Sequence, residues 1–317
     1  MAGLAHNQYD LSSGISMHVA EQGDGLPVIM CHGWPELWYS WRHQIPALAE
    51  AGFHAIAPDQ RGYGRTTAPA EIDAYSQQHI CADLVALLDV LELEQAVFVG
   101  HDWGGAVVWN MALHHPERVR AVAGVNTPFG GQAALPSLEA LKDRAGIWDY
   151  QFYFQEPGEA EAEVEADVER SFRLIFRASD AADEFDILAG FDTVRERGGI
   201  LAGYPADAAR SVMLSAEELD VYVQEFQRTG FRGPFNWYRN NRTSWEWGEE
   251  TKGQTIDCPA LMVTAGKDPV LTPARSEGME SVVPNLVRGH IEECAHWTQQ
   301  ERPDELNAIL IDWLNSL

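Results

Sequence analysis

The sequence of 317 residues has little lysine and no long uninterrupted apolar run. Three lysines leave arginine as the main basic residue, and the net charge of −26 predicts a strongly acidic surface. Such a surface disfavours binding to nucleic acid and to anionic membranes. A membrane-spanning helix needs about 18 or more consecutive apolar residues, so none is expected. The first residues, MAGLAHNQYD, lack a basic segment followed by an apolar one, so we expect no signal peptide.

Cysteine is also scarce, and the cysteines that occur are widely spaced. The spacing contains no C-x-x-C pair of the kind found in zinc sites. We therefore expect free thiols in a reduced, cytoplasmic protein that works without a metal or a cofactor. Hydrophobic residues make up 45% of the chain, which is enough for a sizeable core. The four cysteines are Cys31, Cys81, Cys258 and Cys294.

Short apolar runs, each bounded by glycine, proline, aspartate or asparagine, recur along the chain. Such runs are typical of strands buried on both faces of a parallel sheet. Helical patterns separate them, for example over residues 80–93 and over residues 102–115, where a proline ends the helix. The alternation predicts an α/β fold with a mostly parallel sheet. The predicted strands cover residues 28–31, 55–57, 96–99, 121–125, 260–264 and 286–287.

The alternation stops in the middle of the chain, which is rich in glutamate and aromatic residues. We expect residues 1–130 and 250–317 to form an α/β core, and residues 131–249 to form a helical cap inserted into that core. No internal repeat and no linker to a further domain are visible in the sequence.

Two helices of this cap are predicted from their sequences. Residues 159–176, which are charged first and apolar later, predict one continuous helix. A second helix begins after Ser215, where Glu218 completes a capping box, and it ends at Gly230.

The segment VFVGHDWGG places Asp102 where a predicted strand turns into a predicted helix. Glycines stand two residues before Asp102 and two and three residues after it, as a sharp turn with close packing requires. The helix also directs the positive end of its dipole toward the carboxylate. We interpret the segment as a nucleophile elbow with aspartate in place of serine or cysteine. A simple helix cap is the alternative, but a cap does not need three flanking glycines.

An elbow nucleophile works with an acid and a histidine that follow it in the chain. Asp268 comes just after a late predicted strand, and His296 lies in a loop after the last one. His290 competes with His296, but its place at a strand end favours a structural role. The other acid position, after an earlier strand, holds Asn126, which is not a carboxylate. We therefore predict Asp268 as the acid and His296 as the base.

The segment CHGWPE follows the first predicted strand. Its tight turn is suited to direct a backbone N–H outward, so the N–H groups of Trp34 and Trp103 predict an oxyanion hole. The bond between Trp34 and Pro35 is a candidate cis peptide. Asp59, which follows another predicted strand, is expected to structure its loop.

An aspartate nucleophile narrows the reaction class. Carboxylate attack on an ester would give an anhydride, whereas attack on a saturated carbon gives an alkyl ester on Asp102. Water activated by His296 then attacks Cγ of Asp102, and the oxyanion hole stabilises the tetrahedral species. The substrate is therefore expected to be an epoxide or an alkyl halide.

Proton donors in the cap distinguish these two substrates. An epoxide oxygen leaves as an alkoxide and needs an acid, whereas a halide leaves as a stable anion. Tyrosine, with a pKa of about 10, can supply the proton. The cap holds Tyr150 and Tyr153 in one aromatic segment and Tyr238 in another, which favours an epoxide. Spacing alone does not separate Tyr150 from Tyr153.

Together these segments resemble the epoxide hydrolases of the α/β-hydrolase fold, in particular the catalytic domain of the soluble epoxide hydrolases. The resemblance extends from about residue 28 to the C-terminus. It implies an α/β-hydrolase fold and conversion of epoxides to vicinal diols, with Asp102 as nucleophile, His296 as base and Asp268 as acid. The motifs that carry it are HGWPE, GHDWGG, WDYQFYFQEPG, GFRGPFNWYRN, VTAGKD and HIEECAHW.

The resemblance also separates the tyrosines. It implies that Tyr150 and Tyr238 hold and protonate the epoxide oxygen, and that Tyr153 is a packing neighbour. Trp34 and Trp103 match the positions of the oxyanion hole.

A haloalkane or haloacid dehalogenase is the alternative function, because it would share the aspartate elbow. An esterase is disfavoured by the missing serine or cysteine, and a non-catalytic receptor would need no triad. The expected partners are a small hydrophobic epoxide and water. Aromatic residues of the cap would serve either the interface of a homo-oligomer or the lining of the substrate pocket.

Overall fold

The computed structural model describes residues 3–131, 137–142, 146–179 and 185–317. In this part of the chain, a central sheet has the strand order β1-β2-β4-β3-β5-β6-β7-β8. The pairs from β4 to β8 are parallel, and β1 and β2 add an antiparallel edge. The bounds are β1 (Ala5–Asp10), β2 (Ser16–Gln22), β3 (Leu26–Cys31), β4 (Phe53–Pro58), β5 (Ala96–His101), β6 (Val119–Val125), β7 (Ala260–Ala265) and β8 (Leu286–Ile291).

The six predicted strands are confirmed as β3 to β8, each extended by a few residues. The sequence analysis does not predict β1 and β2, and the reason is their place at the edge of the sheet. Most residues of β1 are exposed, so this strand has no apolar run. In β2, a histidine and a glutamate interrupt the buried apolar residues, which hides the strand from a search for continuous apolar segments.

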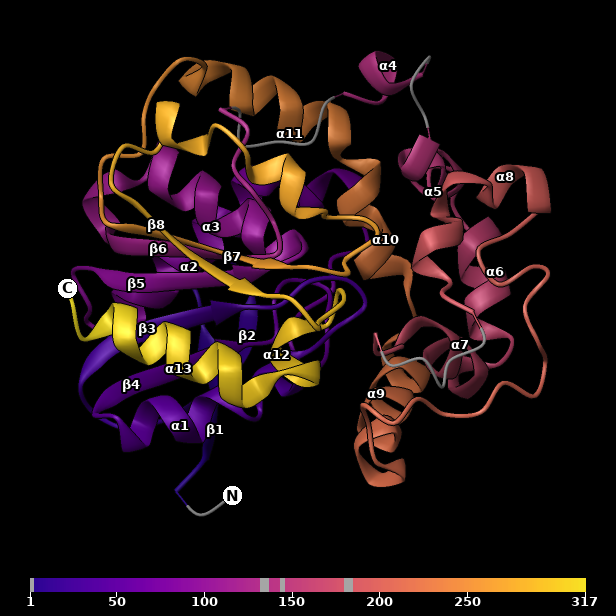
Figure 1. Ribbon diagram of the computed structural model, residues 1–317, viewed down its shortest axis with the longest axis horizontal. Coiled ribbons are helices and arrows are strands. Elements are labelled where there is room, and N and C mark those ends of the chain that lie inside the picture. The colour runs from indigo at the N-terminus through magenta and orange to yellow at the C-terminus, as the bar shows by residue number, and fades with distance from the viewer. Residues whose placement is uncertain (1–2, 132–136, 143–145, 180–184) are drawn as a thin grey trace.

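Helices cover both faces of the sheet (Figure 1). Helices α1 and α13 lie on one face, whereas α2, α3 and α11 lie on the other. The bounds are α1 (Gln44–Glu50), α2 (Gln77–Val90), α3 (Trp103–His114), α4 (Leu138–Leu141), α5 (Asp149–Tyr153), α6 (Glu159–Glu165), α7 (Val168–Ile175), α8 (Val194–Arg197), α9 (Ala216–Thr229), α10 (Arg232–Arg239), α11 (Asn241–Gly248), α12 (Thr298–Glu301) and α13 (Pro303–Leu314).

The two layers of helices explain why the central strands are apolar at every position. In β5, Val97 and Val99 pack into the cluster that α1 and α13 complete, whereas Ala96 and Phe98 pack into the cluster on the opposite face. Successive side chains of a strand point to opposite faces, so a strand that is buried on both faces needs apolar side chains at every position. Among the described residues, no helix has the length and apolar character needed to cross a membrane.

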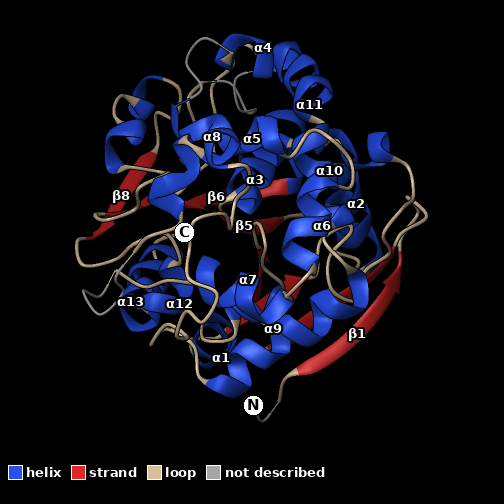
Figure 2. Cartoon of the chain, turned by 90° about the vertical axis from the view of Figure 1, so that its right-hand side faces the viewer, coloured by secondary structure: helices blue, strands red, loops and turns tan. Residues whose placement is uncertain are grey.

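The helices α4 to α11 come between β6 and β7, where the sequence predicts the cap. Figures 1 and 2 show α5 to α9 gathered at one side of the sheet, beyond the end of β5 that leads into α3. We call residues 137–248 the insertion. Part of the predicted boundary, residues 132–136, lies outside the described residues, and the division into core and cap stays a prediction.

Within the insertion, one predicted helix is confirmed and one prediction is wrong. Helix α9 begins after Ser215 with the predicted capping box and ends at Gly230. The single helix predicted over 159–176 is in fact two helices, α6 and α7. Asp167 breaks it, because its backbone leaves the helical region and its side chain accepts the N–H of Arg170 as an N-cap.

Candidate active site

The turn between β5 and α3 holds Asp102 in an unusual backbone conformation. Its φ of 51° and ψ of −121° lie outside the regions that most residues adopt, and the turn is held by packing around it. A Cβ on Gly104 would overlap the carbonyl oxygen of Cys31, so only glycine fits there. The structure therefore contains the sharp strand-to-helix turn that the sequence predicts.

The two carboxylate oxygens of Asp102 have different surroundings. Oδ1 accepts the backbone N–H of Trp34 at 2.8 Å, and the backbone N–H of Trp103 also stabilises the charged carboxylate. Oδ2 lies 3.7 Å from Nε2 of His296. The Asp102 side chain is 19% exposed, whereas His296 is 5% exposed. The carboxylate is thus the accessible member of a largely buried group. The predicted cis bond between Trp34 and Pro35 is also present.

His296 and Asp268 form a buried pair. Nδ1 of His296 lies 2.9 Å from Oδ2 of Asp268. The backbone N–H groups of Val270 and Leu271 donate to Oδ1 at 2.9 and 2.8 Å, and the amide of Asn126 donates to Oδ2 at 2.8 Å. The acid therefore has every oxygen occupied by donors, one of which is the ring of the predicted base.

Burial and charge act in opposite directions on these three groups. Burial raises the pKa of Asp102 above its usual value, although His296 and the two N–H groups oppose the shift. Burial would also raise the pKa of Asp268, but the His296 charge and hydrogen bonds lower it to about 2. Burial disfavours the charged His296 ring, yet the neighbouring carboxylates raise its pKa to about 9. The neighbouring carboxylates thus favour the protonated form of the His296 ring.

Two of the three candidate tyrosines lie at this group. Tyr150, on α5, and Tyr238, on α10, are 5% and 2% exposed, and their ring centres are 5.8 Å apart. Burial raises the pKa of both hydroxyls, and the Asp102 charge raises them further. Tyr153 is directed elsewhere, because its hydroxyl donates to Glu163 at 2.9 Å. The placement agrees with the pair that the resemblance implies.

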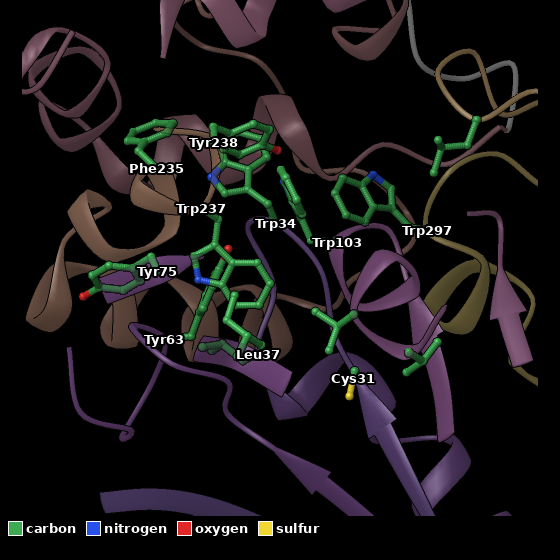
Figure 3. Packing of buried hydrophobic residues seen from close by; sticks show 14 of the residues in the cluster. Cys31, Trp34, Leu37, Tyr63, Tyr75, Trp103, Phe235, Trp237, Tyr238 and Trp297 are labelled. Carbon is green, nitrogen blue, oxygen red and sulfur yellow. The ribbon is translucent and has the colours of Figure 1, made fainter. Parts of the chain in front are cut away.

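Indole and phenol rings enclose the carboxylate on the side of the insertion. The Trp103 ring meets Tyr238 edge-on at 5.1 Å between centres, and the Trp34 ring meets the same tyrosine at 6.0 Å (Figure 3). A cavity of about 40 Å³ remains beside Asp102. It has room for a few water molecules. Its lining is Asp102, Trp103, Ala106, Thr127, Trp148, Tyr150, Val270 and Leu271.

Other candidates from the sequence lie away from this cavity. His290 is exposed on β8, with its two ring nitrogens 2.8 Å from Oγ1 of Thr264 and 2.9 Å from Oε2 of Glu292. Asp59 is buried in its own loop, where it accepts the backbone N–H of Trp38 and bonds to His18. Both positions agree with the structural roles expected from the sequence.

Sequence reasoning missed two residues beneath the site. His101, the residue directly before Asp102, is fully buried. Its Nδ1 lies 2.8 Å from Glu36, and its Nε2 lies 2.7 Å from the backbone oxygen of His296. Glu36 also accepts the N–H of Gly33 and the amide of Gln299. The sequence offered one signal for the contact between Glu36 and His101, namely the acidic residue at the end of the motif HGWPE.

Comparison with known proteins agrees with this geometry. A model of the α/β hydrolase fold family matches residues 27–303. The chain is 49% identical to bifunctional epoxide hydrolase 2 of Sus scrofa over 316 residues, which cover 99% of this chain and 56% of that protein. It is 45% identical to epoxide hydrolase A of Mycobacterium tuberculosis over 315 residues, which cover 96% of both chains. The crystal structure of epoxide hydrolase A from Mycobacterium thermoresistibile is similar with a TM-score of 0.87, at 41% identity and with 98% of both chains covered.

The chain spans about half the length of the mammalian relatives that it matches. The match to the mycobacterial proteins extends over nearly their whole length. The chain therefore belongs to the α/β hydrolase fold family and, within it, to the epoxide hydrolases.

The close approach of Gly33 to Asp102 gives a first prediction. A Cβ at position 33 would overlap Cβ and Oδ1 of Asp102. We expect Gly33→Ala to displace the carboxylate and to lower kcat/KM for a styrene-type epoxide by at least about 100-fold. Gly130→Ala is the control, since a Cβ there meets none of the described residues within 4 Å. Equal turnover by the two variants, both folded by circular dichroism, would contradict the assignment.

Proposed function

We propose that this chain is an epoxide hydrolase that converts a small hydrophobic epoxide to a vicinal diol through an ester on Asp102. One observation carries the proposal. The carboxylate of Asp102 has one oxygen on backbone N–H groups and the other facing His296, next to two buried tyrosines. The names of the relatives, which are epoxide hydrolases, support the same reaction.

In the first step, Oδ2 of Asp102 attacks a ring carbon of the epoxide. The bond from that carbon to the epoxide oxygen breaks, and its electron pair stays on the oxygen. Tyr150 and Tyr238 hold this oxygen, and one of them donates its proton. An alkoxide is about as strong a base as hydroxide and far stronger than a tyrosinate, so even a tyrosine of raised pKa is acidic enough. The products are a neutral ester on Asp102 and a tyrosinate.

Loss of the Asp102 charge prepares the base. That charge is one of the causes that raise the pKa of His296 to about 9 in the free enzyme. Once the ester forms, the Asp102 charge no longer raises the pKa of His296. The protonated ring can then donate a proton to the tyrosinate. The transfer leaves a neutral imidazole, which is the form that a general base needs.

In the second step, His296 takes a proton from water while the water oxygen attacks Cγ of Asp102. The negative charge develops on Oδ1, which already accepts the N–H of Trp34, and the N–H of Trp103 also stabilises a charged carboxylate group here. The tetrahedral species then expels the diol oxygen, which takes the remaining water proton. Asp102 is again a carboxylate and His296 is again protonated, so atoms and charge balance over the cycle.

The insertion has a defined part in this proposal. As a cap over residues 131–249, it supplies both tyrosines and excludes bulk water from the ester. The cavity beside Asp102 lies between residues of the core, such as Val270 and Leu271, and residues of the insertion, such as Tyr150, which is where the substrate is proposed to bind. The relatives that the chain matches are named epoxide hydrolases, which does not favour a dehalogenase. A haloalkane is therefore a control substrate, and halide release without diol formation would reverse the proposal.

Replacement of the base should trap the intermediate. We expect His296→Gln to form the ester but to hydrolyse it slowly, because glutamine cannot accept the proton of water. The measurement is mass spectrometry of the protein after addition of an epoxide, with an expected increase equal to one substrate molecule on the peptide that contains Asp102. His290→Gln is the matched control and should turn over normally. Normal turnover by His296→Gln would show that another group is the base.

The tyrosines provide a test of the first step. We expect Tyr150→Phe and Tyr238→Phe each to slow ester formation, and the double variant to lose most of it, since general acid catalysis contributes about 10²- to 10⁴-fold. Tyr153→Phe, which removes a hydroxyl directed at Glu163, should retain the rate of ester formation. Stopped-flow measurement of a single turnover provides this rate. A double variant with the rate of the unmodified enzyme would mean that both rings only pack.

The pH dependence of the second step has a defined direction. The ester removes a negative charge next to His296, so its pKa in the intermediate should lie below the value of about 9 in the free enzyme. The rate of ester hydrolysis should therefore increase with pH and reach half of its limit below pH 9. Single-turnover decay of the ester across pH measures this midpoint. A midpoint above 9 would show that the ester does not weaken the protonated ring.

A further inference from the structure

The end of β6 carries two polar residues that have no step in the proposed mechanism. Asn126 and Thr127 directly follow Val125, the last residue of the strand. Asn126 is 1% exposed, and its φ of 64° lies in the left-handed region. This conformation lets the two successive side chains reach different neighbours.

The amide of Asn126 joins the loop of the acid to the loop of the base. Its Nδ2 donates to Oδ2 of Asp268 at 2.8 Å and to the backbone oxygen of Ala295 at 3.3 Å. Its Oδ1 accepts the hydroxyl of Thr298 at 2.7 Å. Ala295 and Thr298 lie on either side of His296, so one buried side chain contacts the acid and both flanks of the base loop.

Thr127 reaches in the other direction, to the nucleophile. Its hydroxyl donates to the backbone oxygen of Asp102 at 2.8 Å. Its own backbone oxygen accepts the indole N–H of Trp109, on α3, at 2.9 Å. The end of β6 is therefore hydrogen-bonded to the nucleophile turn in two places. One bond reaches Asp102 itself, and the other reaches Trp109 on helix α3.

The order of the strands explains why this position can reach all three groups. Strand β6 lies between β5, which leads to Asp102, and β7, which leads to Asp268. The pairing is parallel, so the carboxyl ends of the three strands meet at one edge of the sheet. The end of the middle strand adjoins both neighbours.

We propose that Asn126 and Thr127 form a positioning clamp, which sets the nucleophile Asp102 at its distance from His296 and Asp268. The clamp rests on the proposed function, because its purpose is to hold the groups of that reaction. The gap of 3.7 Å between Oδ2 of Asp102 and Nε2 of His296 separates residues on different loops. The clamp bonds both of these loops to one residue pair that directly follows the buried strand β6.

The clamp also explains why this position holds an amide. The sequence places Asn126 at the other acid position of the fold, where a carboxylate would be compatible with the elbow. A carboxylate here would lie 2.8 Å from Oδ2 of Asp268, and two like charges at that distance repel strongly. The amide instead donates to Asp268 and helps to keep its pKa near 2.

The first test removes the amide without strain in the backbone. Glycine adopts a φ of 64° freely, so Asn126→Gly isolates the loss of the side chain. We expect ester hydrolysis to slow by at least about 10-fold and ester formation by less than about 3-fold, because the amide acts on the acid and the base. Single-turnover kinetics separates the two rates. Hydrolysis at the unmodified rate would overturn the clamp.

The variant Asn126→Asp tests the clamp through the pH dependence of ester hydrolysis, which a merely structural role would leave unchanged. Because two carboxylates 2.8 Å apart do not both ionise, Asp268 would share a proton with the new acid and would stabilise the protonated His296 ring less. The pH midpoint of ester hydrolysis should therefore move downward. Asn110→Asp is the control, because it places the same new acid on α3 within the same core. An unchanged midpoint for Asn126→Asp, or an equal shift for Asn110→Asp, would contradict the proposal.

Thr127 tests the other half of the clamp. Thr127→Val removes the hydroxyl at constant shape and should slow ester formation by at least about 10-fold, while Thr127→Ser should restore it to within about 3-fold. Equal rates of ester formation for the two variants would show that Thr127 is not part of the clamp. Failure of the proposed function looks different, because the unmodified enzyme would then form no ester at all.

Discussion

The negative charge of Asp102 is the interaction on which the rest of the site depends. It lies between His296, whose pKa it raises, and two tyrosines, whose pKa values it also raises. In the mechanism that we propose, the carboxylate becomes an ester, and all three shifts then weaken at the same moment. The tyrosines would thereby become stronger acids as the alkoxide needs a proton, and the histidine would become neutral as water needs a base. In the proposed cycle, one change of charge therefore sets the order of the two steps.

The fold places that charge by its strand ends. Parallel strands bring their carboxyl ends to one edge, so the loops after β3, β5, β6, β7 and β8 meet there. The loop after β3 supplies the N–H of Trp34, and the turn after β5 supplies Asp102. Beneath them, Glu36 and His101 carry a hydrogen-bond path to the backbone of His296. The path adds a second buried acid below the base, which favours its protonated form as well.

The sequence predicted the core well because its signals are local. Buried strands are apolar at every position, and the elbow needs small residues at fixed spacing, so β3 to β8 and the turn at Asp102 could be located. The edge strands have no such run, and the break between α6 and α7 depends on one capping side chain, Asp167. Contacts of Asn126 and His101 join segments more than 60 residues apart, so no local pattern reports them. The choice between Tyr150 and Tyr153 came from resemblance, since both stand on the five-residue helix α5.

The insertion explains how buried tyrosines and a charged nucleophile coexist. Tyrosines at the surface would keep a pKa near 10 and would meet bulk water, which competes for the alkoxide. Packed against Trp34 and Trp103, Tyr238 is instead held within an apolar layer beside the carboxylate. In the proposed mechanism the two tryptophans therefore act twice, because their backbone N–H groups stabilise the Asp102 carboxylate while their rings pack against the proposed acid. A substitution at either ring should consequently change ring opening more than it changes the hydrogen bonds to the carboxylate.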